Sequence, residues 1–531
     1  MPNIGESQPL LARRIRRGRS EDVTGVEKTT PIRRGRPDYI RFDMSFPRSA
    51  GILLHPTSLP GANGIGEIGP EAHRFLDFLA EAGMKIWQML PIGPTGYGNS
   101  PYQCFSAFAG NSLLVHVPDQ PGHFPAHRVN FERVIPHQRA LLRQATADFV
   151  PDDGYHAFVA DQGWWLEDYA LFMALKKAHG GVAWTDWDRG AALRDPAALD
   201  DWKSRLADEM EHGRREQWFF FQQFRALREA CGDRGISLMG DIPIYVAHDS
   251  ADVWSNPSLF ELDDDGRPVV QAGVPPDYFS TTGQLWGNPI YDWEAMRARG
   301  YDWWIRRMRS AFELFDLVRV DHFRGFEAYW EVPAAETTAV NGRWVKGPGA
   351  DLFTAITAAL GPLPIVAENL GLITPEVETL REQFGYPGMS ILQFAFGSDG
   401  LASTFLPHTY PRERVVYTGT HDNDTTVGWW HSTGAGDSTR SADDVTKERD
   451  HAMRYLGTDG REMHWTLIRT ALASVADIAL IPMQDVLGLG SKARMNVPGR
   501  QSGNWEFRYS HDQLTPEISG RLRDLVDLYQ R

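Results

Sequence analysis

The chain has 531 residues, of which 42% are hydrophobic, so it is long enough to bury a large core. Its formal net charge of −15 argues against a general nucleic-acid-binding protein, because a polyanion would be repelled. The two cysteines, Cys104 and Cys231, form neither a disulfide framework nor a metal-binding spacing, and we expect free thiols in a reducing cytoplasm.

The first 48 residues are rich in arginine, with five arginines between positions 13 and 19. Such a segment could be a nucleic-acid arm or a targeting leader. It also contains the acidic residues Glu21, Asp22 and Glu27, and it lacks an amphipathic apolar stripe. We therefore expect residues 1–48 to form a solvated, flexible tail.

Eight short apolar runs follow, most of them preceded by a helical pattern. Near-continuous apolar strands that alternate with helices are typical of a buried parallel sheet. Eight such strands predict an α/β fold, a closed (β/α)₈ TIM barrel over residues 49–531. The expected strands are residues 51–55, 86–90, 237–241, 317–321, 364–368, 390–395, 415–420 and 477–482.

The spacing between these strands is uneven. Residues 91–236 separate the second strand from the third, far more than one βα connection needs. Part of this gap is predicted to be helical, at residues 164–177 and 214–230. We expect insertions on the C-terminal rim of the barrel at about residues 97–210 and 245–299, the second of which leads into a helix at 301–315.

Acidic residues stand at the C-terminal ends of four expected strands, where a (β/α)₈ barrel builds its active site. They are Asp241, Asp321, Glu368 and Asp422, the last preceded by His421. One acid in such a place can be a helix cap or a loop anchor. Four on separate strands are hard to explain in this way, because like charges repel at close range, so we expect a catalytic site.

Arg319 lies two residues before Asp321 on the same expected strand, so both side chains point to one face. The guanidinium should keep this carboxylate ionised and orient it, whereas Glu368 follows three apolar residues and could keep its proton. A purely structural ion pair is the alternative interpretation.

Two chemistries use such a cluster of carboxylates. One is divalent-metal binding, to which His55 and His421 would contribute. The other is glycosyl transfer by a nucleophilic carboxylate and an acid/base carboxyl group. An arginine is seldom found next to a bound metal ion, so Arg319 favours glycosyl transfer, and we expect neither a metal nor a cofactor.

Five motifs then resemble those of one enzyme family: GVPPDYFSTTGQLWGNP (273–289), RVDHFRGFEAYW (319–330), AENLG (367–371), THDND (420–424) and ARMNVPGRQSGNW (493–505). Over residues 49–531 the chain resembles the amylomaltases, also called 4-α-glucanotransferases or disproportionating enzymes, of glycoside hydrolase family 77 in the α-amylase superfamily. The resemblance implies a retaining enzyme that moves α-1,4-glucan segments to the 4-hydroxyl of an acceptor maltodextrin or glucose through a covalent glucosyl-aspartate.

The resemblance also implies a role for each strand-end residue. Asp321 matches the nucleophile, Glu368 the general acid/base, and Asp422 the third carboxylate, which stabilises the transition state. Arg319 matches the partner of the nucleophile, and His421 matches a ligand of the sugar hydroxyls. Asp241 matches a position that binds the donor sugar. One residue departs from the family pattern: Asn369 stands where an aspartate usually follows the catalytic glutamate.

Further residues are expected to bind substrate because their motifs resemble those of the family. The segment 273–289 is interpreted as a loop that closes over the acceptor and excludes water; the alternative is a surface loop whose aromatic residues simply pack down. Phe394 could be a sugar platform or a core residue. The expected binding residues are Ser100, Tyr102, Asp277, Tyr278, Phe279, Trp286, Phe394 and Asn496.

We therefore expect a cytoplasmic enzyme that acts on α-1,4-glucans and maltooligosaccharides, as a monomer or a weak homo-oligomer. Nucleic acid is not an expected partner because of the net charge of −15. A membrane is not expected either, since no run of about 18 apolar residues occurs. A hydrolysing α-glucosidase or amylase of the same superfamily is the nearest alternative. A metal-dependent barrel hydrolase and a non-catalytic glucan-binding barrel are more distant alternatives.

Overall fold

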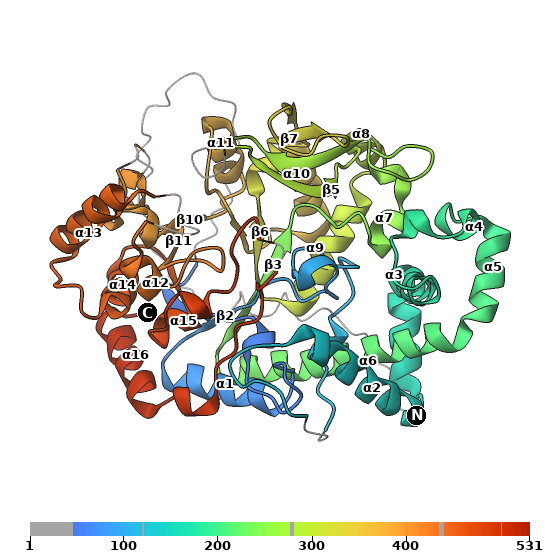
Figure 1. Cartoon of the computed structure of the whole chain (residues 1–531), viewed down its shortest axis with the longest axis horizontal. Helices are drawn as coiled ribbons and strands as arrows, with labels where there is room; N and C mark the ends of the chain where they lie inside the picture. Colours follow the sequence, from blue (N-terminus) through green and yellow to red (C-terminus); the bar gives the residue numbers. More distant parts are fainter. Residues whose placement is uncertain are drawn as a thin grey trace, which may run out of the picture. The chain divides into compact units, whose positions relative to one another are not determined.

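Eight parallel strands form the centre of the fold in the computed structural model (Figure 1). The structure describes residues 46–118, 122–276, 281–398, 400, 402–434, 440–500 and 502–531, so residues 1–45 of the predicted tail lie outside the described residues. All eight predicted strands are confirmed. They are β1 (Ser49–Leu53), β2 (Ile86–Gln88), β3 (Ser237–Pro243), β6 (Leu317–Asp321), β9 (Ile365–Ala367), β10 (Gly388–Ile391), β11 (Arg414–Tyr417) and β12 (Ile478–Pro482).

The strands pair in the order β10, β11, β12, β1, β2, β3, β6, β9. The two end strands meet where the amide of Ala367 donates to the carbonyl of Pro387 at 2.9 Å, which closes the ring. Alternate side chains fill the interior, among them Met239, Val366 and Tyr417, and the intervening ones pack against the helices outside. The predicted (β/α)₈ barrel is therefore confirmed.

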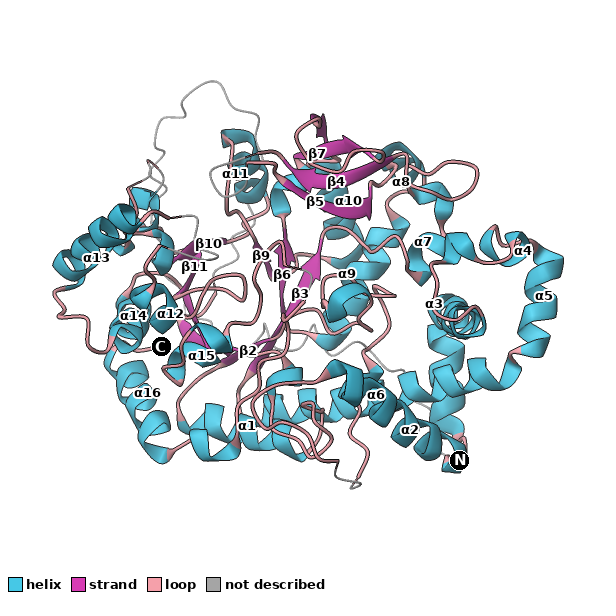
Figure 2. Cartoon of the chain, in the orientation of Figure 1, coloured by secondary structure: helices cyan, strands magenta, loops and turns pink. Residues whose placement is uncertain are grey.

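The helices lie around this ring of strands (Figure 2). The predicted helices at residues 164–177, 214–230 and 301–315 lie within or along α3 (Asp153–Ala178), α6 (Ala207–Asp233) and α9 (Asp302–Leu314), respectively. The helices that accompany the barrel strands are α1 (Pro70–Glu81), α6 (Ala207–Asp233), α9 (Asp302–Leu314), α10 (Ala350–Leu360), α11 (Pro375–Gln383), α12 (Thr426–His431), α13 (Ala442–Leu456), α14 (Met463–Ala473), α15 (Met483–Val486) and α16 (Pro516–Leu528).

The long gap between β2 and β3 is largely helical. It holds α2 (Phe131–Asp148), α3 (Asp153–Ala178), α4 (Arg189–Ala192) and α5 (Pro196–Arg205) before α6 leads into β3. In α3, Asp152 caps the first turn by accepting from the amide of Tyr155 at 2.8 Å. Buried aromatic rings of α3, such as Trp165, pack against α6, for example against Phe221 at 6.0 Å.

A second sheet lies over the C-terminal ends of the barrel strands, at the top of Figure 2. It is antiparallel, in the order β5, β4, β7, β8. Residues 270–274 and 284–289 form two of its strands. The prediction of a loop over the whole of residues 273–289 was therefore wrong. The strands are β4 (Val270–Val274), β5 (Gln284–Pro289), β7 (Ala328–Pro333) and β8 (Arg343–Lys346), and the short helices α7 (Ala251–Ser255) and α8 (Trp293–Ala298) flank the first two in sequence.

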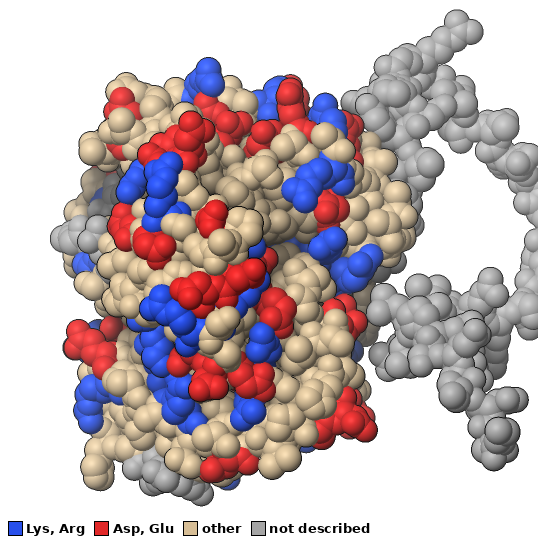
Figure 3. Space-filling view, turned by 90° about the vertical axis from the view of Figure 1, so that its right-hand side faces the viewer, with Lys and Arg blue, Asp and Glu red and all other residues tan. Residues whose placement is uncertain are grey.

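The face of the molecule in Figure 3 shows acidic and basic side chains interspersed, instead of a continuous basic patch. Exposed ion pairs among the described residues include Arg189 with Asp265 at 2.9 Å. Within the described part of the chain, no helix is both long enough and apolar enough to cross a bilayer.

Arg48 connects the entrance of β1 to the C-terminal elements. Its guanidinium donates to the carbonyls of Leu472, Ser474, Ala476 and Tyr529 at 2.9–3.3 Å. Carbonyls at the C-terminal end of α14 carry the negative end of the helix dipole, so a cation stabilises them.

We expect Arg48→Met to lower the free energy of unfolding by about 2 kcal/mol, because the variant loses charge-assisted hydrogen bonds while the methionine keeps part of the packing. Denaturant unfolding followed by circular dichroism measures this change. Turnover of the folded variant should equal that of the parent protein, because Arg48 lies at the opposite end of the strands from the acidic residues. An unchanged free energy of unfolding would contradict the role of Arg48.

Candidate active site

An arginine between two carboxylates forms the floor of the site. β3 and β6 are neighbours in register, with Asp241 beside Arg319 and Pro243 beside Asp321. Arg319 Nη1 donates to both oxygens of Asp241 at 2.8 and 2.7 Å, and its Nη2 donates to Asp321 Oδ1 at 2.7 Å. The side chain of Asp241 is fully buried, whereas 29% of the Asp321 side chain is exposed. Asp321 is therefore the carboxylate that a substrate can reach.

Glu368 follows β9 and is held by two backbone amides. Its Oε2 accepts from the amide of His322 at 2.8 Å, and its Oε1 accepts from the amide of Leu370 at 2.6 Å. His322 has a left-handed φ of 51°, a conformation that L-residues seldom adopt, and it directs its amide at the carboxyl group.

Burial, and after it the negative charge of Asp321, raise the pKa of Glu368 to about 7, against the lowering effects of Arg319 and the two amides. Such opposed environments suit one ionised and one protonated carboxyl group at neutral pH. The expectation that Glu368 could keep its proton agrees with this direction.

Asp422 lies on the loop that follows β11, and 47% of its side chain is exposed. Asn496 Nδ2 donates to its Oδ1 at 2.7 Å, and His421 Nε2 lies 3.4 Å from its Oδ2. The ring of His421 stacks on that of Tyr102 at a centroid distance of 5.2 Å, and the Tyr102 hydroxyl donates to Asp241 Oδ2 at 2.8 Å. These contacts join the two sides of the barrel mouth.

The other predicted binding residues have mixed surroundings. Ser100 Oγ accepts from the amide of Tyr102 at 3.2 Å, so it belongs to the same wall of the site. Trp286, on β5, meets the ring of His322 edge-on at 4.8 Å. Phe394 is partly buried beside the barrel interior and contacts Phe405 at 5.5 Å. Three further predicted residues, Asp277, Tyr278 and Phe279, lie outside the described residues.

Sequence reasoning missed three contributors to the site. His322 acts through its backbone amide, and nothing in its side chain signals that role. Trp505 lies 6.0 Å from Tyr102 and 6.1 Å from His421, and it was read only as the end of a motif. Glu378 accepts from Asn369 Nδ2 at 2.6 Å. An aspartate at 369 would face this carboxylate, so Asn369 suits its neighbour here.

The alternative of a metal site gains no support from the side-chain arrangement. Within the described ranges, no three His, Cys, Asp or Glu side chains are grouped so that they could hold an ion. His55, considered as a contributor, is buried, and burial followed by the nearby His421 lowers its pKa to about 3. Both cysteines are free, with Cys231 buried and Cys104 partly exposed.

Comparison with known proteins identifies the family. Residues 54–515 match the family model of glycoside hydrolase family 77, described as 4-alpha-glucanotransferase. The chain belongs to the 4-α-glucanotransferase family. The resemblance drawn from the five motifs is thereby confirmed, and so is the enzyme class.

Relatives at high identity cover almost the whole chain. The 4-alpha-glucanotransferase of Thermus thermophilus is 50% identical over 92% of this chain and 100% of its own. That of Synechocystis is 49% identical over 91% of this chain and 98% of its own. Among solved structures, the amylomaltase from Streptococcus agalactiae in complex with acarbose has a TM-score of 0.86 at 36% identity, over 91% of this chain and 99% of that one.

We expect Asp321→Asn to lower the pKa of Glu368 by about 1 unit, because it removes the neighbouring negative charge that disfavours ionisation of Glu368. An infrared or ¹³C NMR titration of the Glu368 carboxyl group, assigned by comparison with Glu368→Gln, measures this pKa. The parent protein should titrate near pH 7.

Asp422→Asn is the matched control. It removes a charge at the same barrel mouth, but Asp422 is not among the main causes of the raised pKa of Glu368. The pKa of Glu368 should stay unchanged in this variant. An equal pKa in the Asp321→Asn variant and the parent protein would contradict the electrostatic coupling.

Proposed function

We propose that this 4-α-glucanotransferase works by double displacement, with Asp321 as nucleophile and Glu368 as acid/base. In the first step an oxygen of Asp321 bonds to the anomeric carbon of the donor. The glycosidic C–O bond breaks, and the leaving oxygen takes the proton of Glu368. In the second step the 4-hydroxyl oxygen of an acceptor attacks the same carbon, its proton passes to Glu368, and the bond to Asp321 breaks. Two inversions retain the α configuration.

The observation that carries this proposal is the unlike environment of the two carboxyl groups. Arg319 holds Oδ1 of Asp321 at 2.7 Å, and we assign the attack to Oδ2. A pKa of about 7 leaves a large fraction of Glu368 protonated at neutral pH, as an acid requires.

The same coupling supports the reversal of the role of Glu368 between the two steps. When Asp321 is esterified it loses its negative charge, so the pKa of Glu368 falls and the group becomes a carboxylate. It can then accept the proton of the incoming hydroxyl group. The charge of the nucleophile thus sets the protonation state that each step needs.

The remaining residues are proposed to hold the donor sugar. Asp422 would stabilise the oxocarbenium-like transition state, which its exposed carboxylate can approach, and Asn496 would orient it. Ser100 and Phe394 are further candidates for contacts with the glucan. His421 and Tyr102 are proposed to bind sugar hydroxyls directly. Asp241 was expected to bind the donor sugar, but its side chain is fully buried, so it is proposed to hold Arg319 and Tyr102 in place instead.

Transfer exceeds hydrolysis when an acceptor hydroxyl reaches the anomeric carbon more readily than water does. We propose that the hairpin of β4 and β5 forms the wall that excludes water on the acceptor side. Trp286 supports this role, because its ring lies against His322, whose amide holds Glu368. Asp277, Tyr278 and Phe279, which lie outside the described residues, remain predicted acceptor contacts.

α-1,4-Glucans and maltooligosaccharides are the proposed substrates. The S. agalactiae amylomaltase that resembles this chain over most of its length is in complex with acarbose. A glucan has C–H faces that suit the aromatic rings at the barrel mouth and hydroxyl groups that suit its carboxylates.

Incubation with maltotriose tests the proposal. The parent protein should release glucose and build longer maltodextrins with no net gain of reducing ends. Asp321→Asn and Glu368→Gln should each lower kcat by about 10³-fold or more, since each removes a group that acts on the reacting bond. A rise in reducing ends by the parent protein, or turnover retained in either variant, would contradict the proposal.

We expect Trp286→Ala to raise the ratio of hydrolysis to transfer by about 3- to 10-fold, because the lost ring opens the acceptor side to water. Reducing-end assays alongside product chromatography give this ratio. Trp164→Ala is the matched control, since Trp164 is a partly exposed tryptophan on α3. Equal ratios in the Trp286 and Trp164 variants would argue against the water-excluding wall.

A further inference from the structure

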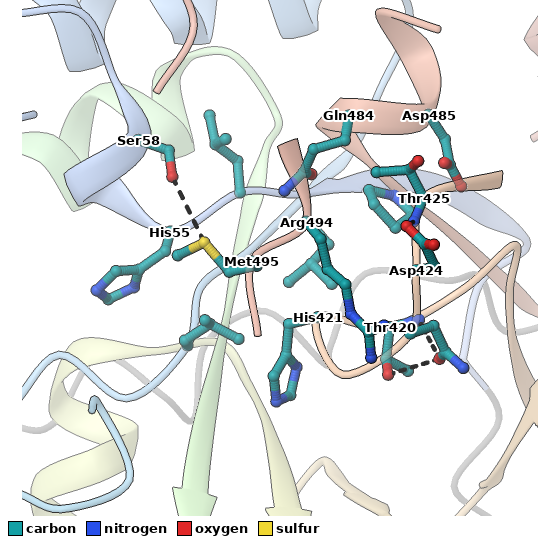
Figure 4. A pocket seen from close by; sticks show the side chains of 15 residues that line it. His55, Ser58, Thr420, His421, Asp424, Thr425, Gln484, Asp485, Arg494 and Met495 are labelled. Carbon is teal, nitrogen blue, oxygen red and sulfur yellow. Dashed lines mark hydrogen bonds between the residues drawn. The ribbon is translucent and has the colours of Figure 1, made fainter. Parts of the chain in front are cut away.

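The loop that carries Asp422 lies over a cavity. The cavity is small, about 20 Å³, which is room for one water molecule, and it is lined by loop residues between Thr420 and Thr425. Gln484, Asp485, Arg494 and Met495 also line it (Figure 4). Even a small cavity reduces packing on that side of the loop, so polar contacts contribute more to its position.

Asp485 fixes both ends of this loop. The residue is buried, with 1% of its surface exposed. One of its oxygens accepts from the hydroxyl groups of Thr418 and Thr426 at 2.6 and 2.7 Å, and the other accepts from the amide of Thr426 at 2.6 Å. Thr418 follows β11 and Thr426 begins α12, so the ends are anchored while the middle spans the cavity.

Arg494, which also lines the cavity, extends its guanidinium toward the loop (Figure 4). Its Nη2 donates to the backbone carbonyl of Asp422 at 2.6 Å, and its Nε donates to the backbone carbonyl of Asn496 at 2.6 Å. The side chains of these same two residues bond to each other, Asn496 Nδ2 to Asp422 Oδ1 at 2.7 Å. The amide of Asn496 also donates to the carbonyl of His421 at 3.1 Å.

We propose that Arg494 is a positioning residue for the third carboxylate, acting through the peptide carbonyls of Asp422 and Asn496. One planar guanidinium sets the distance between the two backbone segments. It thereby aligns the side-chain amide of Asn496 with the carboxylate of Asp422. This inference rests on the proposed function, because the position of Asp422 affects turnover only if its carboxylate acts on the donor sugar.

The geometry requires an arginine at this position. The Nε–H and Nη2–H bonds are held at a fixed angle, so two carbonyls on different segments are tied in one orientation. A lysine would offer a compact, freely rotating charge and could not hold both with the same rigidity. Because 47% of the Asp422 side chain is exposed, water competes for its oxygens and burial alone does not hold it.

Steady-state kinetics of Arg494→Met and Arg494→Lys test the proposal. Both should lower kcat by about 10- to 100-fold, since a misplacement of about 1 Å in a site has effects of this size, and KM should change much less. Arg48→Met is the matched control: this arginine also donates to several backbone carbonyls, but at the opposite end of the barrel. It should lower stability and leave kcat unchanged.

A double-mutant cycle with Asp422→Asn separates positioning from a general structural effect. If Arg494 acts through Asp422, Arg494→Met should cause little further loss of kcat in the Asp422→Asn variant. Losses that multiply in full would overturn the inference, as would a kcat for Arg494→Met equal to that of the parent protein.

Chemical rescue gives an independent readout. Guanidinium ion, added to Arg494→Ala at concentrations far below those that unfold proteins, should restore part of kcat and leave Arg48→Met unaffected. No restoration at any such concentration would count against the inference. If Asp422→Asn itself keeps full turnover, the proposed role of Asp422 fails and the inference fails with it. An active-site role confirmed for Asp422 together with an inert Arg494 overturns the inference alone.

Discussion

The charge balance around Arg319 is the constraint on which the rest of the site depends. This buried cation lies between Asp241, which has no exposed side-chain surface, and Asp321, which opens toward the mouth. A buried guanidinium without partners would be strongly destabilising, and so would a buried carboxylate alone. The pair of neighbouring strands therefore holds three charged groups that make each other tolerable, and Asp321 is left ordered and accessible at the centre of the barrel mouth.

The second half of the chemistry follows from the first. Asp321 repels a negative charge on Glu368, whose burial already favours the neutral form, and two backbone amides hold the carboxyl group in place. A reaction that esterifies and frees Asp321 in turn would shift the proton affinity of Glu368 in the direction that each step requires. The two carboxyl groups thus work as one electrostatic unit, and replacement of either changes the properties of both.

The sequence was sufficient to predict features that depend on the regular spacing of side chains within one strand. Arg319 and Asp321 share a face because side chains alternate along a strand, and eight apolar runs specify eight buried strands. The sequence was insufficient where the structure depends on contacts between segments that are far apart in the chain. Glycines and prolines in residues 273–289 resemble a loop, yet β4 forms because it pairs with β5 and with β7, which comes after β6 in the sequence. The contact between Asp422 and Asn496 joins two loops, and no periodic signal records it.

The seam of the barrel between β9 and β10 has a bearing on heat tolerance. Regular pairing runs around the other seven junctions, whereas here the amide of Ala367 meets Pro387, and Asn369 bridges the seam by accepting from the amide of Met389 at 2.8 Å. Glu368 lies between these two connections. Segments with few backbone hydrogen bonds open locally at a lower free energy than the core. Glu368, the proposed acid/base, lies at this seam, so we expect heating to cost activity before the other junctions of the ring separate.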